Sequence, residues 1–78
     1  PNPFNPSTKI KFDLKQSGFV NLTVYDALGR KVSTLVNKPM LKGTHSVNFE
    51  GKDLSSGIYF YKLSINDFVM TKKMILMK

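Results

Sequence analysis

Apolar and polar residues alternate with a period of two along almost the whole chain, and this pattern constrains the fold more than any other feature. In residues 9–14, Ile, Phe and Leu alternate with Lys and Asp, and similar alternation returns in residues 20–25 and 44–49. Successive side chains of a strand point to opposite faces, so each segment predicts a strand with one buried face. No ten-residue window has helical spacing. The sequence therefore predicts an all-β protein.

Turn-forming residues separate the predicted strands. Asp26-Ala27-Leu28-Gly29 has the composition of a short hairpin loop in which Gly29 takes a positive φ. A returning strand over residues 30–36 is expected to end before the break at residues 39–43. The aromatic-rich segment 58–65 is predicted to be a central strand, and residues 68–77 form the last one. The other predicted turns are at Gly18, residues 51–57 and residues 66–67.

Six or seven short strands in 78 residues favour a compact antiparallel β-sandwich of the immunoglobulin-like type. Residues 53–61 support it, because an Asp, small residues and a Tyr at this spacing are similar to the tyrosine corner of that fold. Tyr61 would then occupy the position of the second Cys of an immunoglobulin domain, and Leu54 would close the bottom of the core. We expect residues 1–7 to be a stiff, proline-rich lead-in from a larger body and residues 8–78 to be the domain.

Charge and composition exclude several classes of function. Twelve Lys and Arg against five Asp and Glu give a net charge of +7, which favours anionic partners, but the cations are scattered and no recognition motif for nucleic acid accompanies them. No apolar run is long enough for stable membrane insertion. The single His45 and the dispersed carboxylates form no triad, acid–base pair or metal site, so we expect no enzyme and no cofactor.

Four blocks of residues, in order, resemble the type A C-terminal sorting domains of the Por-type (type IX) secretion system, which occur at the ends of exported proteins of Bacteroidetes and their relatives. The resemblance covers nearly the whole chain. The pattern is also similar to the immunoglobulin-like domain of the flagellar hook-capping protein. The four blocks are residues 1–8 (PNPFNPST), 24–30 (VYDALGR), 54–59 (LSSGIY) and 72–78 (KKMILMK).

The resemblance implies a non-catalytic secretion signal that directs an upstream cargo domain of the same parent chain across the outer membrane. The partners would be the type IX secretion machinery and a sortase-like protease that cleaves near the lead-in, after which the cargo is released or joined to lipopolysaccharide. The protein would pass through the periplasm and end up secreted or on the cell surface. Five residues fall in the signal motifs and are our candidate recognition residues: Gly57, Tyr59, Lys72, Lys73 and Lys78.

Alternative interpretations remain open. Gly57 and Tyr59 have a structural explanation as a corner and a core aromatic, and lysines on an edge strand such as Lys72 and Lys73 protect against aggregation. A hook-capping type of assembly module would bind a neighbouring subunit through its strands. A carbohydrate-binding accessory domain would need exposed aromatic rings, and unpaired strand edges leave the oligomeric state open. The candidate rings are Tyr25, Phe60 and Phe68.

Overall fold

The period-two alternation produces six antiparallel strands, which the computed structural model describes over residues 7–78. Residues 1–6 of the predicted lead-in (residues 1–7) lie outside these described residues. The strands are β1 (Ser7–Leu14), β2 (Gly18–Asp26), β3 (Lys31–Met40), β4 (Gly43–Glu50), β5 (Gly57–Ile65) and β6 (Phe68–Leu76).

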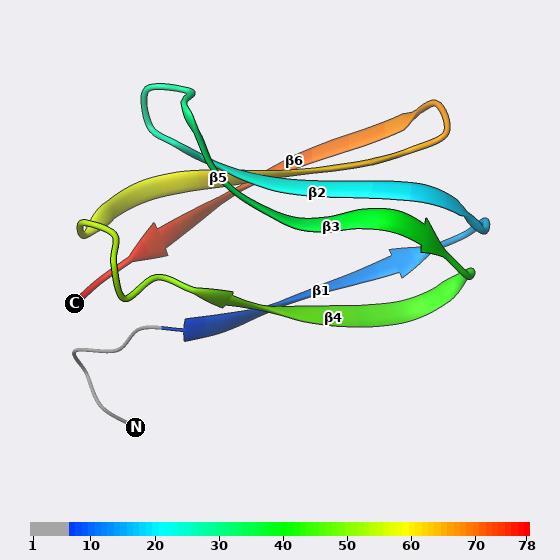
Figure 1. The fold of residues 1–78 in the computed structure, drawn as a ribbon, viewed down its shortest axis with the longest axis horizontal. Coiled ribbons are helices and arrows are strands. Elements are labelled where there is room, and N and C mark those ends of the chain that lie inside the picture. The colour runs from blue at the N-terminus through cyan, green and yellow to red at the C-terminus, as the bar shows by residue number, and fades with distance from the viewer. Residues whose placement is uncertain (1–6) are drawn as a thin grey trace.

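The strands form two sheets of unequal width. One sheet contains only β1 and β4, and the other has the order β3-β2-β5-β6. Figure 1 shows the pair β1 and β4 as one layer and the other four strands as the second. This arrangement confirms the predicted all-β sandwich, with β2 and β5 as the two central strands of the wider sheet.

The core lies between the sheets and is formed by the apolar positions of the alternating pattern. Ile10, Phe12 and Leu14 of β1 are buried, and their Lys and Asp neighbours are exposed. The three Val and Leu side chains of β2 are completely inaccessible to solvent. Leu54 packs against the core from the loop between β4 and β5, as expected. Aliphatic and aromatic burial of this kind is the main favourable contribution to folding in a chain without Cys.

The turns agree with the sequence with one exception. Asp26 begins the predicted hairpin loop, and Gly29 has a φ of 83°. The prediction that the third strand ends near Val36 was wrong, because β3 continues through Pro39 to Met40. β3 pairs only with β2 among the described residues, so its other edge needs no backbone donor and tolerates a proline.

Candidate recognition surface

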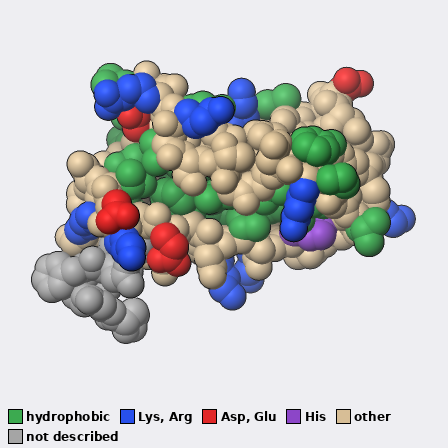
Figure 2. All heavy atoms as spheres, viewed as in Figure 1, with side chains coloured by type: hydrophobic (Ala, Val, Ile, Leu, Met, Phe, Trp, Pro, Cys, Tyr) green, Lys and Arg blue, Asp and Glu red, His purple; other side chains and the backbone are tan. Residues whose placement is uncertain are grey.

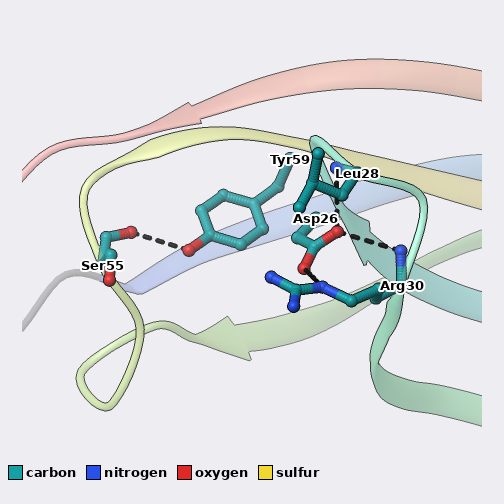
Figure 3. A network of polar contacts seen from close by, with 5 residues as sticks. All are labelled: Asp26, Leu28, Arg30, Ser55 and Tyr59. Carbon is teal, nitrogen blue, oxygen red and sulfur yellow. Dashed lines mark hydrogen bonds and ion pairs between the residues drawn. The ribbon is translucent and has the colours of Figure 1, made fainter.

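Tyr59 forms the corner that the sequence predicted. Its ring is buried, with 7% of the residue exposed, and its hydroxyl donates a hydrogen bond of 2.7 Å to the carbonyl oxygen of Ser55 (Figure 3). The bond runs from the start of β5 back to the preceding loop, four residues upstream. A buried phenol hydroxyl needs such an acceptor, and this bond fixes the loop against the start of β5. Tyr59 therefore has a structural role.

Gly57 is required by the backbone conformation and not by lack of space. Its φ is 156°, a value that side-chain-bearing residues rarely adopt, and a Cβ added there would have no neighbour within 4 Å. Gly57 is the first residue of β5 and is paired with Leu76 of β6. This glycine sets the direction in which the chain enters the central strand.

Lys72 and Lys73 lie in the middle of β6, the outermost strand of the wider sheet, and both are exposed. Lys72 is paired with Tyr61 and Lys73 with Phe60. Because adjacent residues of a strand point to opposite faces, Lys72 lies on the side that faces the other sheet and Lys73 on the outer side. The two cations therefore flank the unpaired edge of β6, where either a partner or protection against aggregation accounts for them.

Lys78 is held against the loop between β4 and β5. Its ammonium group donates a hydrogen bond of 2.5 Å to the carbonyl oxygen of Lys52, and its backbone amide donates one of 3.1 Å to the hydroxyl of Ser56. Figure 1 shows the C-terminus at the same end of the molecule as this loop. Lys78 thus fastens the last strand to the corner of the sandwich, a role that edge protection does not explain.

The five candidate residues lie on two parts of one hairpin. Gly57, Tyr59 and Lys78 lie around the loop between β4 and β5, whereas Lys72 and Lys73 lie further along β6. Ser55, Ser56 and Lys52 also belong to this corner through backbone or hydroxyl groups. Sequence reasoning missed Lys52 and Ser56 because contacts between a turn and a distant chain end leave no periodic signal.

Asp26 organises the loop between β2 and β3. Its carboxylate accepts hydrogen bonds from the backbone amides of Leu28 and Arg30, each at 2.9 Å, and from the Arg30 side chain at 2.7 Å (Figure 3). The backbone hydrogen bond from Arg30 is the main cause that lowers the pKa of this carboxyl. Asp26 is thus a capping carboxylate of the turn in the block 24–30.

His45 is a packing residue. Its ring lies against Phe12 with a centroid separation of 5.7 Å, and its Nε2 is 2.7 Å from the carbonyl oxygen of Leu41. Residues 7–78 contain no group of three His, Cys, Asp or Glu side chains that could hold a metal ion. The same residues contain no helix with the length and apolar character needed to cross a membrane.

The three candidate rings for carbohydrate stacking do not form one platform. Tyr25 and Phe60 are paired across β2 and β5, are half-buried, and the ammonium of Lys62 lies 5.6 Å from the centre of the Tyr25 ring. Phe68 is 55% exposed but is paired with Ile65, which faces the core. Phe68 therefore lies on the face of the wider sheet opposite to the one that carries Tyr25 and Phe60. The geometry does not favour a flat stacking surface.

The charged side chains are dispersed. Figure 2 shows Lys and Arg scattered over the visible face, between hydrophobic and polar surface, with few acidic groups. This distribution agrees with a net charge of +7 spread along the sequence. The face drawn in Figure 2 shows no single basic stripe of the kind that binds nucleic acid among residues 7–78.

Comparison with known proteins identifies one family. The sequence matches the family described as the secretion system C-terminal sorting domain over residues 1–77. No curated protein and no solved structure matches the chain. Because the match extends from the first residue to the last strand, the chain belongs to the family of secretion system C-terminal sorting domains.

Proposed function

We propose that the exposed edge of β6, with Lys72, Lys73 and Lys78, is the surface through which the secretion machinery recognises this domain. As a member of its family the domain is a C-terminal sorting signal for type IX secretion, a route through the periplasm to the outer membrane or beyond. The observation that supports the proposed surface is the position of β6. It pairs with β5 on one side, its other edge has no strand partner within residues 7–78, and exposed cations flank that edge.

The folded domain contributes no reaction of its own in this proposal. Its buried residues are needed to build the sandwich, and Gly57 and Tyr59 act indirectly by fixing the corner that carries the C-terminus. The cargo precedes the domain in the same parent chain, and a sortase-like protease of the pathway cleaves near residues 1–8. The exported cargo is then secreted or retained on the cell surface.

The test is export of a reporter that carries residues 1–78 at its C-terminus in a host with the type IX machinery. One variant changes Lys72, Lys73 and Lys78 to Ser. The matched control changes Lys31, Lys38 and Lys42 to Ser, which removes the same charge from β3 and its following turn at the opposite edge of the sheet. Circular dichroism establishes that both variants fold.

We expect the β6 variant to accumulate in the periplasm and the β3 variant to leave the cell like the wild type. The Lys78 ammonium group also donates a hydrogen bond to the carbonyl oxygen of Lys52. A further variant with only Lys72 and Lys73 changed therefore separates recognition from the attachment of the C-terminus. Equal export of the β6 and β3 variants would show that the edge of β6 is not the recognised surface.

A further inference from the structure

The narrower sheet leaves part of the wider one uncovered. Phe68 and its cross-strand partner Ile65 lie on the same face of the wider sheet, yet Ile65 is 7% exposed and Phe68 is 55% exposed. Met70, two residues further along β6, is only partly buried on this face. β1 and β4 cover the central strands, but no third strand of their sheet lies opposite β6 among the described residues.

A groove runs along this open side between β1 and β6. Its larger part, about 480 Å³, lies where Leu14 and Ile65 meet Phe68. A smaller part, about 290 Å³, continues from Phe68 along Met70, with the buried Phe12 and Leu63 as its floor. The two parts share Asp13 and Phe68, so they form one continuous channel, which is lined by both apolar and charged side chains.

The backbone of β1 borders this groove with an unpaired edge. β1 pairs only with β4 within residues 7–78, so the groups on its other side have no strand partner there. Neighbouring strands lie about 4.8 Å apart and stacked sheets about 10 Å apart. A strand added at this edge would therefore lie opposite β6 and cover the exposed faces of Phe68 and Met70.

The side chains along the groove also favour a particular charge in an incoming strand. Phe68, Met70 and Lys72 are spaced two residues apart and lie on one face of β6, in the order apolar, apolar, cationic. On the β1 side the groove is also lined by Lys11 and by Asp13, whose carboxylate already accepts a hydrogen bond from the Thr44 hydroxyl. An incoming strand that complements this row carries two apolar residues and then an acidic residue, each separated by one position.

We propose that the unpaired edge of β1 accepts an extended segment of the secretion machinery with the pattern apolar-x-apolar-x-acidic, as a third strand of the narrower sheet. This inference rests on the proposed function and specifies its binding mode. Main-chain hydrogen bonds to β1 supply part of the affinity, and the row on β6 supplies the specificity. Lys72 belongs both to this groove and to the edge of β6 that we propose as the recognised surface.

A synthetic peptide tests the binding mode directly. The capped peptide Thr-Leu-Thr-Val-Thr-Glu-Thr is titrated into the ¹⁵N-labelled domain and amide shifts are followed by NMR. We expect shifts along β1 and around Phe68 and Met70, and an affinity about tenfold weaker for Phe68→Ser. The control is Phe19→Ser, because Phe19 is 56% exposed but lies on β2 away from the groove. A peptide with Lys in place of Glu should bind more weakly, and the Lys72→Glu variant should reverse this preference.

Three results would overturn the proposal. The first is the absence of shifts along β1, and the second is an equal effect of Phe68→Ser and Phe19→Ser. The third is concentration-dependent self-association without peptide that Phe68→Ser abolishes, because the groove would then bind a second copy of the chain.

The reporter assay keeps this proposal separate from the proposed function. If Phe68→Ser is exported like the wild type while the variant with Ser at positions 72, 73 and 78 is not, the groove proposal fails and the β6 surface stands. If that lysine variant is exported normally, the proposed surface fails, and the peptide titration still decides whether β1 accepts a strand.

Discussion

Replacing Tyr59 with Phe removes one hydrogen bond and leaves the buried ring in place. The lost bond is the 2.7 Å contact between the Tyr59 hydroxyl and the Ser55 carbonyl oxygen. A typical intramolecular hydrogen bond contributes about 1 kcal/mol net. Ser55 is an exposed residue and the bond is part-buried, so we expect a loss close to this net value and not the larger penalty of a fully buried, unsatisfied acceptor.

The expected change in stability is large enough to measure and too small to unfold the domain. A loss of about 1 kcal/mol lowers the melting temperature of a domain of this size by roughly 4–8 °C. The total stability of 78 residues is about 4–12 kcal/mol. The Tyr59→Phe variant is therefore expected to remain folded at 25 °C and to be exported normally below its melting temperature.

Thermal unfolding followed by circular dichroism measures this effect, with Tyr61→Phe as the matched control. Tyr61 is two residues further along β5, and its hydroxyl makes no hydrogen bond within residues 7–78, so its melting temperature should stay close to that of the wild type. Equal melting temperatures for the two variants would refute the corner as a stabilising contact. Loss of export by a folded Tyr59→Phe domain would show instead that the hydroxyl contacts a partner.

Three further changes test other parts of the structure. Gly51→Ala places a Cβ 2.7 Å from a Leu76 methyl carbon, so we expect a loss of about 1–3 kcal/mol in denaturant unfolding, and wild-type stability would show that β6 moves aside freely. Asp26→Asn should reduce the loss of stability on acidification, because folding lowers the pKa of the Asp26 carboxyl. Such a carboxyl stabilises the folded state above its unfolded-state pKa and loses this contribution as the pH falls through its folded-state pKa. Melting temperatures of the variant between pH 2 and pH 7 that run parallel to those of the wild type would contradict this. Phe12→Leu removes the buried ring that stacks on His45 and should lower the free energy of unfolding by about 1 kcal/mol, whereas an unchanged value would mean that neither the stack nor the lost ring volume contributes to stability.

The strands and the corner could be predicted because they depend on local patterns. Alternation marks β1, β2 and β4 directly, since the period of side chains along a strand is two. Gly29 and the residues before Tyr59 are turn formers with strong backbone preferences, and both turns are as expected. The family resemblance rests on the same short blocks, and the match over residues 1–77 confirms it.

The remaining features depend on contacts between distant residues. The pairing of β1 with β4, in which Ser7 lies opposite Glu50, is not written in the alternation of either segment. Pro39 suggests a break unless β3 is known to be an edge strand. The exposure of Phe68 depends on the narrowness of the opposite sheet, which sequence periodicity cannot show.

One localisation measurement tests whether residues 1–78 act as a sorting signal. A periplasmic reporter is produced with and without this domain at its C-terminus, in a host with the type IX machinery and in the same host without it, and the fraction outside the cell is measured by quantitative immunoblotting. We expect the reporter to leave the periplasm only when both the domain and the machinery are present. Retention of the tagged, folded reporter in the host that has the machinery would contradict it.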